Sequence, residues 1–254
     1  QPSATPSMTS TSTPTPLPWG TMSISAENAS NMVQLAAWGR GSVYRYERTE
    51  AGRLMVLSSL GIDLYQADTF ELLADFPGGV RFLISDDQQL AAILFGDGLV
   101  SIVDLIKGEK KFDLLYVPKM PVNFCEGCDE KLIDQFREWF YQSAPLAFSK
   151  DHSKLAVASM DGSILVWNLE DGKQITRLYH DSGGMDQGIL FTSDGQHLLT
   201  IGRQPIAYVR YSSMSYWSIE EEKMLWYQKV SGRLDARLSS PDGNLFGVLI
   251  RPAG

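Results

Sequence analysis

Residues 144–180 decide the fold of this chain; their sequence is APLAFSKDHSKLAVASMDGSILVWNLEDGKQITRLYH. Turn-forming residues divide the stretch into short apolar runs, and two of the turns contain Asp-Gly, at 161–162 and 171–172. Asp-Gly supplies the left-handed backbone that a tight hairpin needs, and short apolar runs between such turns are typical of β-strands. The stretch therefore predicts an antiparallel meander of four strands, over Leu146–Phe148, Leu155–Ala158, Ile164–Trp167 and Ile175–Leu178.

The rest of the chain repeats this unit less regularly. The position of Trp167 is taken in the other units by Tyr65, Val103 and Trp217. The sequence WSIEEEK from Trp217 aligns without a gap on WNLEDGK from Trp167, and the unit of Val103 keeps the spacing between its Asp-Gly dipeptide and this position. One four-stranded sheet cannot bury both of its faces alone, so we expect similar units to stack around an axis.

The unit resembles a blade of the WD-repeat (WD40) β-propeller family at three places: Ser159, the turn Asp161-Gly162, and Trp167-Asn168, where the family has Trp-Asp. The resemblance implies a β-propeller fold and a structural, hydrogen-bonded brace to which Ser159, Asp161 and Trp167 contribute. Trp217 holds the equivalent position in a later blade, whereas the blade of Val103 must depend on apolar packing. The opening ISAENASNMVQLAAWGRG is similar to the lead-in of bacterial WD-repeat proteins. The function that the resemblance implies is a non-catalytic scaffold for protein–protein interaction.

We therefore expect a disordered stalk over residues 1–21 and a β-propeller over 22–254. About four and a half four-stranded antiparallel blades are expected, at residues 43–76, 80–117, 144–180, 187–230 and, as a partial blade, 234–254. A short N-terminal helix at 25–39 and a helical insertion at 118–143 interrupt the all-β pattern. Half a blade leaves an open sheet edge. We expect either a five-bladed ring closed by residues 22–24, or a chain that is the front part of a longer, seven-bladed protein.

The insertion contains the only cysteines of the chain, Cys125 and Cys128. Two residues separate them, so the thiols can close a small disulfide, which is our interpretation. Free thiols, a redox motif and a zinc site remain as alternatives, although a redox CxxC normally lies in a strand-helix unit and zinc needs two further ligands. The three His residues have no ligand-like spacing, so we expect no metal and no other cofactor.

Aromatic residues suggest two candidate partner surfaces. In the predicted helix of the insertion, Phe136, Trp139 and Phe140 share one face. Aromatic anchors dominate protein interfaces, so this stripe is a candidate docking surface; the alternative is that it covers its own domain. Tyr208 and Tyr211 lie in a long connection of the fourth blade, and they either form an exposed recognition rim or alternate along an extended hairpin.

Composition limits the classes of partner and the location. The 254 residues carry a net charge of −8 with scattered Lys and Arg, which argues against a nucleic-acid face and a polybasic membrane patch, so we expect a protein partner. No apolar run reaches the roughly 18 residues of a membrane span. Residues 1–18 are rich in Ser, Thr and Pro and carry no charged side chain, which predicts an extended stalk. Such a stalk is typical of exported proteins tethered to a surface or a lipid; the alternative is an interdomain linker.

The sequence shows no catalytic motif: a nucleophile elbow, a phosphate-binding loop, His-Glu-x-x-His and a calcium loop are all missing from it. We interpret acidic turns such as Asp86-Asp87 and Glu170-Asp171 as hairpin chemistry. The leading hypothesis is a non-catalytic scaffold that binds a protein partner. One alternative is a propeller enzyme or periplasmic ligand-binding propeller with a site at the central channel. Another is a sensor module of a larger signalling protein.

Overall fold

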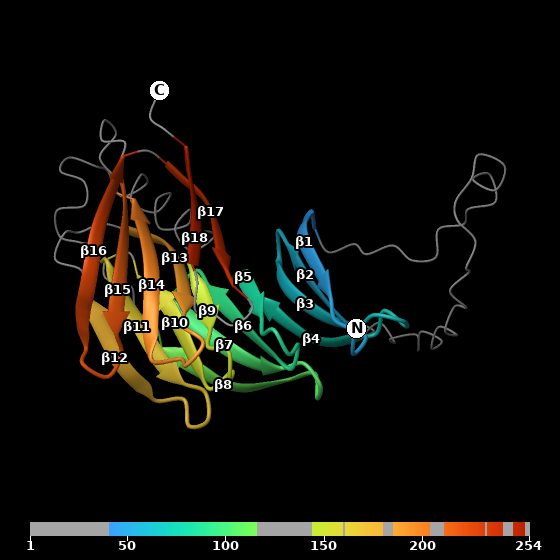
Figure 1. Cartoon of the computed structure of the whole chain (residues 1–254). Coiled ribbons are helices and arrows are strands. Elements are labelled where there is room, and N and C mark those ends of the chain that lie inside the picture. The colour runs from blue at the N-terminus through green and yellow to red at the C-terminus, as the bar shows by residue number, and fades with distance from the viewer. Residues whose placement is uncertain are drawn as a thin grey trace, which may run out of the picture.

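The computed structural model describes residues 41–115, 144–159, 161–179, 185–203, 211–231, 233–240 and 246–251. Every regular element in these ranges is a β-strand, and the strands form four antiparallel sheets of four strands and one strand pair (Figure 1). The prediction of an all-β fold built from repeated four-stranded antiparallel sheets is therefore confirmed for the described residues. The expected stalk, N-terminal helix and helical insertion lie outside the described residues.

Each sheet pairs its strands in chain order. Sheet 1 contains β1 (Val43–Arg48), β2 (Arg53–Ser58), β3 (Gly61–Gln66) and β4 (Leu72–Pro77). Sheet 2 contains β5 (Gly79–Ile84), β6 (Leu90–Phe95), β7 (Leu99–Asp104) and β8 (Glu109–Leu115). Sheet 3 contains β9 (Leu146–Phe148), β10 (Lys154–Ala158), β11 (Ser163–Asn168) and β12 (Gln174–Tyr179). Sheet 4 contains β13 (Met185–Phe191), β14 (His197–Arg203), β15 (Tyr211–Ser218) and β16 (Lys223–Ser231), and sheet 5 contains β17 (Arg233–Ser239) and β18 (Phe246–Arg251).

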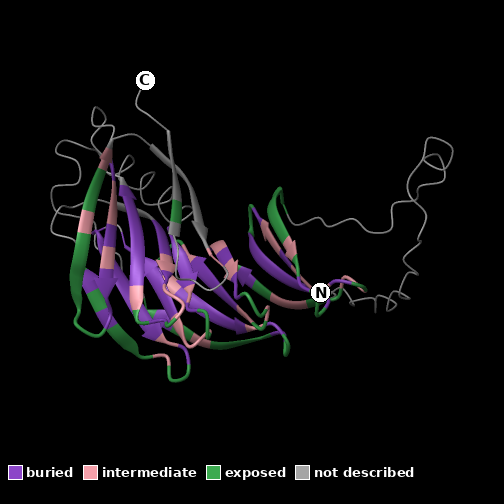
Figure 2. Ribbon diagram, in the orientation of Figure 1, coloured by how far each residue is buried: buried purple, intermediate pink, exposed green. Residues whose placement is uncertain are grey.

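Sheets 1 to 4 stack face to face, so sheets 2 and 3 are buried on both sides. They follow one another from sheet 1 in blue to sheet 4 in orange (Figure 1), and their central strands are buried (Figure 2). In sheet 3, Leu155 and Trp167 pack toward sheet 2, whereas Ala156 and Val166 belong to the apolar cluster shared with sheet 4. Since side chains alternate across a strand, burial of both faces requires a continuous apolar run. This explains the apolar strands of residues 144–180.

The first strands of sheets 2 and 4 contact the preceding sheet. β5 contacts β2 and β3, and β13 contacts β9 and β10. The last strands are more exposed, and β12 and β16 present Ile175, Tyr179 and Trp226 to solvent. We call the row of first strands, β5, β9, β13 and β17, the inner edge.

A β-bulge recurs where the third and fourth strands of each sheet pair. The register shifts in each case at the position of Trp167, that is at Tyr65, Val103, Trp167 and Trp217. The next residue caps the following turn: the Asp104 carboxylate accepts a hydrogen bond from the Ile106 N–H at 3.0 Å, and the Asn168 Oδ1 accepts one from the Glu170 N–H at 2.7 Å. Asn168 therefore makes the same kind of cap in sheet 3 as Asp104 makes in sheet 2.

Backbone hydrogen bonds join the first and third turns of each four-stranded sheet. The Leu105 N–H donates to the Gln89 carbonyl, and the Leu169 N–H donates to the Ser153 carbonyl, both at 2.8 Å. Equivalent bonds run from Ala67 to Gly52 in sheet 1 and from Ile219 to Gln196 in sheet 4. Both turns therefore lie at the same end of every sheet, which we call the turn end.

Candidate functional site

The first turns of sheets 2, 3 and 4 share a frame of Ser or Thr, one variable residue, and Asp. In sheet 3 the Ser149 hydroxyl donates to Asp151 at 2.6 Å and accepts from the Lys154 N–H at 2.9 Å, while Asp151 accepts from the Ser153 N–H at 3.1 Å. The same three bonds occur in sheets 2 and 4 around Ser85–Asp87 and Thr192–Asp194. The hydrogen bonds of the turn therefore use the side chains of the first and third residues of the frame.

These hydrogen bonds favour the ionised form of the frame carboxyl groups. The bond from the Ser149 hydroxyl, opposed by burial, lowers the pKa of Asp151 to about 2. The bond from Thr192 likewise lowers the pKa of Asp194. Burial alone would raise the pKa of Asp87, but the hydrogen bonds that it accepts and the nearby His152 ring hold that pKa below its usual value. All three aspartates are therefore structural anions at neutral pH.

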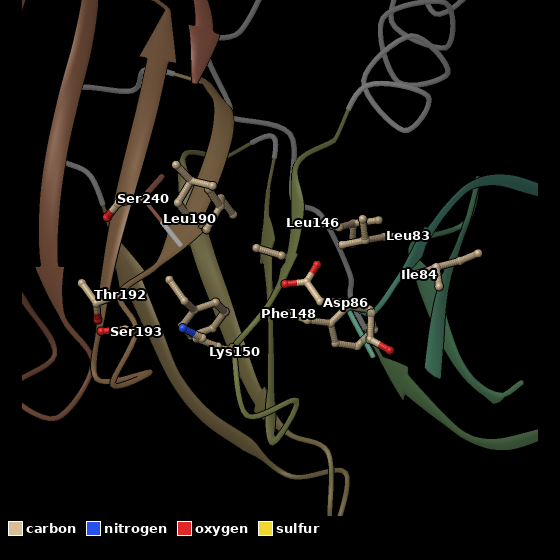
Figure 3. A pocket seen from close by; sticks show the side chains of 14 residues that line it. Leu83, Ile84, Asp86, Leu146, Phe148, Lys150, Leu190, Thr192, Ser193 and Ser240 are labelled. Carbon is tan, nitrogen blue, oxygen red and sulfur yellow. The ribbon is translucent and has the colours of Figure 1, made fainter. Parts of the chain in front are cut away.

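The middle residues of the frames meet at one cavity on the inner edge. Asp86, Lys150 and Ser193 line a cavity of about 430 Å³, together with Ser240, which follows β17 (Figure 3). We call these four the rim residues. The cavity wall is apolar and comes from β5, β9 and β13 through Leu83, Ile84, Leu146, Phe148, Ile189 and Leu190. Residues far apart in the sequence thus form one site with an apolar wall and a mixed polar rim.

Side chains also link the first turns of neighbouring sheets. Gln88 and His152 have left-handed backbones, with φ of 58° and 55°, a conformation that costs about 1–2 kcal/mol for a residue with a Cβ. Gln88 Oε1 accepts a hydrogen bond from the Glu50 N–H at 2.6 Å, and His152 Nδ1 lies 3.0 Å from Asp87 Oδ2. At the equivalent position Gly195 packs against sheet 3 without a side chain. The turns hold one another in place and so fix the spacing of the rim residues.

The predicted brace residues lie in β11 and in the turn between β10 and β11. Ser159, Asp161 and Trp167 are all buried, and Trp167 packs in the cluster between sheets 2 and 3. Asp161 accepts hydrogen bonds from the Ser163 N–H at 3.0 Å and the Ser163 hydroxyl at 2.6 Å, and it pairs with the Arg177 guanidinium. Burial would raise the pKa of Asp161, but these hydrogen bonds and the Arg177 charge hold it below its usual value. Asp161 therefore has partners on β11 and β12.

The equivalent residue of sheet 4, Trp217, is 1% exposed and donates its indole N–H to the Thr200 hydroxyl at 3.1 Å. Sequence reasoning did not single out Thr200, Ser163 or Arg177. A polar residue within an otherwise apolar strand, such as Thr200 in HLLTIGR, was the available signal, because a buried hydroxyl needs a partner.

The side chains of the predicted partner surfaces and of the predicted disulfide are not among those that the structure describes. Cys125, Cys128, Phe136, Trp139, Phe140 and Tyr208 lie outside the described residues. Tyr211 begins β15, and only its backbone is described. These assignments stay predictions.

The rim residues were missed by sequence reasoning, which treated Asp86-Asp87 as one piece of hairpin chemistry. Asp87 does have that role, since it accepts the hydrogen bonds of its turn, but Asp86 points to the cavity. The available signal was the repeated Ser/Thr-x-Asp frame, in which the outer residues recur and the middle residue varies among Asp, Lys and Ser.

The described ranges contain neither a cluster of metal ligands nor a membrane-spanning helix. No group of three or more His, Cys, Asp or Glu side chains there is arranged to hold a metal ion. No helix there is long and apolar enough to cross a membrane.

Comparisons with known proteins bear on the fold. No protein-family model and no curated protein matches the sequence. The structure is similar to a solved structure titled Kuenenia stuttgartiensis Hydrazine Synthase, with a TM-score of 0.57 and 14% sequence identity. The match covers 84% of this chain and 56% of that one, so the chain spans little more than half of the matched protein. At this identity the likeness concerns the fold alone.

Proposed function

We propose that this chain is a β-propeller of WD-repeat type, with about four and a half blades, that acts as a non-catalytic binding module for a protein partner. The recurring four-stranded sheets, the bulge at the Trp167 position and the turn that follows it support the propeller assignment. The inner edge then corresponds to the side facing the propeller axis, and the cavity opens on the central channel.

One observation carries the binding role: equivalent positions of different sheets place different side chains at one cavity. Their neighbours in the frame, such as Ser149 and Asp151, are fixed by turn hydrogen bonds. The middle residue differs from frame to frame, as Asp86, Lys150 and Ser193, so each sheet presents a different side chain to the cavity. A rigid scaffold that presents variable loop residues at one place is the usual construction of a binding surface.

The size and lining of the cavity suit a side chain or short loop of a partner. Its volume of about 430 Å³ falls within the range of about 300–1,000 Å³ for ligand pockets. The apolar wall can bury a carbon skeleton, and the rim can orient a polar group.

A second candidate function uses the same cavity. The solved structure similar to this chain carries the name of an enzyme, which favours the alternative of a propeller enzyme or a small-ligand-binding propeller. The alternative of a sensor module within a larger signalling protein also requires binding at this cavity. The enzyme requires a small molecule to react there, whereas the binding module requires only capture.

The test is selection of a random-peptide phage library on the immobilised full chain. We expect enriched peptides that lose binding to S193W, because the indole fills the cavity from a rim position. The matched control is E220W, which places the same side chain on an exposed turn of sheet 4 and should retain binding. Peptides that bind S193W as well as wild type would remove the cavity from the proposal.

We also propose that the chain acts outside the cytoplasm, tethered through the stalk at residues 1–21. The support is the Ser/Thr/Pro composition of that segment and the close cysteine pair. We expect the native protein in the extracytoplasmic fraction of its source cells, with Cys125 and Cys128 resistant to thiol labelling before reduction. Labelling of both thiols in unreduced cytoplasmic protein would contradict this.

A further inference from the structure

We propose that the cavity receives a basic side chain, lysine or arginine, from the partner, and that Asp86 is the acceptor of its charge. This inference rests on the proposed binding function and assigns the chemistry of the bound group.

Asp86 is an acid that its own turn does not use. The frame is closed by Ser85 and Asp87, and Asp87 also approaches His152 of the next sheet. Asp86 is exposed and lines the cavity, and its carboxylate makes no hydrogen bond or ion pair with the part of the chain that the structure describes. It is therefore ready to pair with an incoming cation without breaking an internal contact.

The wall beside Asp86 suits the stem of a long basic side chain. Leu83, Leu146 and Phe148 line the same cavity as Asp86 (Figure 3). Lysine and arginine bury their methylene stems along apolar surface while the charged head reaches a polar group. A cation near an aromatic ring gains further attraction from the ring face. The combination of carboxylate, aliphatic wall and phenyl ring therefore fits a basic side chain better than an acidic or purely apolar one.

The distribution of charge along the rim favours the same ligand. Among the lining residues, Asp86 of sheet 2 is the acid. Lys150 of sheet 3 carries the opposite charge, but it already interacts within the chain. Ser193 and Ser240 are neutral. The rim therefore offers an unpaired negative charge to the partner more readily than a positive one.

The experiment uses methyl-labelled full-length protein titrated with single amino-acid amides and followed by NMR at the methyl groups of Leu83 and Leu146. The probes are the N-acetyl amides of arginine, glutamic acid and norleucine. We expect the arginine amide to shift these methyl signals and to bind about tenfold more tightly than the norleucine amide. Arginine can donate a charge-assisted hydrogen bond to Asp86, whereas norleucine cannot. Raising the salt concentration should lower the affinity for the arginine amide more than the affinity for the norleucine amide.

Two variants make the test specific. D86N should reduce the affinity for the arginine amide about tenfold, to that of norleucine, because the side-chain shape remains and the charge is lost. D75N removes the same charge from an exposed position on β4 and should leave the affinity unchanged. Equal binding of the arginine amide to D86N and wild type, or no shift with that amide, would overturn the inference.

Failure of the inference about Asp86 can be distinguished from failure of the proposed binding function. One such result is enriched phage peptides that lose binding to S193W yet contain no basic residue, and another is peptides that lose binding to K150Q and not to D86N. Either result would support the binding role and show that Asp86 has no part in it. Enriched peptides that all carry Lys or Arg and lose binding to D86N would support both.

Discussion

Sheets 2 and 3 share strand order, bulge position and turn hydrogen bonds, yet they fill the bulge position differently. Sheet 3 places Trp167 there, and sheet 2 places Val103, and both residues are almost fully buried against the preceding sheet. A smaller side chain therefore serves in the same backbone position, and it is equally buried in an apolar cluster. The comparison teaches that the turns and the alternation of the strands define each sheet, while the side chain at the bulge can vary.

The two sheets also differ in how their polar networks hold an aspartate. In sheet 3 the buried Asp161 pairs with Arg177, whereas in sheet 2 Asp113 on the outer strand accepts hydrogen bonds from Ser101 at 2.5 Å and Lys110 at 2.8 Å. The Asp161 side chain is 10% exposed and that of Asp113 is 35% exposed. We therefore expect the two sheets to tolerate matched substitutions unequally.

The largest expected effect is loss of the large side chain at the bulge. W167A should lower the free energy of unfolding by about 3–5 kcal/mol through lost burial and a residual cavity, and V103A by about 2 kcal/mol. Urea denaturation followed by circular dichroism measures both, with E220A on an exposed turn expected to stay within about 0.5 kcal/mol of wild type. Equal losses for W167A and V103A would mean that the space at Trp167 collapses on substitution.

A smaller effect is expected from the two aspartates. D161N should cost about 1–2 kcal/mol, because Arg177 loses its charged partner while the amide still accepts from Ser163. D113N should cost less than about 1 kcal/mol, because its lysine pair is more exposed. A double-mutant cycle of D161N with R177Q measures the coupling directly. A coupling of zero would show that Arg177 does not stabilise the buried carboxylate.

The smallest effect is expected from the pH dependence of stability at the first turn of sheet 3. The pKa of Asp151 is about 2 in the folded protein and about 3.9 in an unfolded chain. A depressed folded pKa adds stability that is present above about pH 4 and is lost as the pH falls toward 2. Urea midpoints measured between pH 5 and 3 should fall less steeply for D151N than for wild type. Identical slopes would contradict the role of the Ser149 hydrogen bond.

The strands could be predicted from the sequence because each is an apolar run closed by turn residues. The run Ile164–Trp167 was extended in the structure by only one residue at each end, to Ser163–Asn168. The long connection after Gly202 predicts either a loop or an extended hairpin. In the structure β14 ends at Arg203 and β15 begins at Tyr211, so both strands extend into this connection. Residues 204–210 lie outside the described ranges.

The cavity could not be predicted, because it depends on how the sheets stack. Asp86 and Lys150 are 64 positions apart, and nothing local indicates that their turns face one cavity. The partners of Asp161 were missed for a similar reason, since Arg177 reaches it only through the pairing of β11 with β12. Patterns along the chain reveal strands and turns, whereas a site formed between sheets requires their order in space.

The interleaving of frame and rim residues has an evolutionary consequence. In the frame of sheet 2, Asp86 stands between the two residues that build the first turn and takes no part in its hydrogen bonds, so a single codon change at position 86 alters what the cavity presents while the architecture persists. Paralogues can therefore diverge in recognition at little thermodynamic cost, and a designer can rewrite specificity at this position without rebuilding the scaffold.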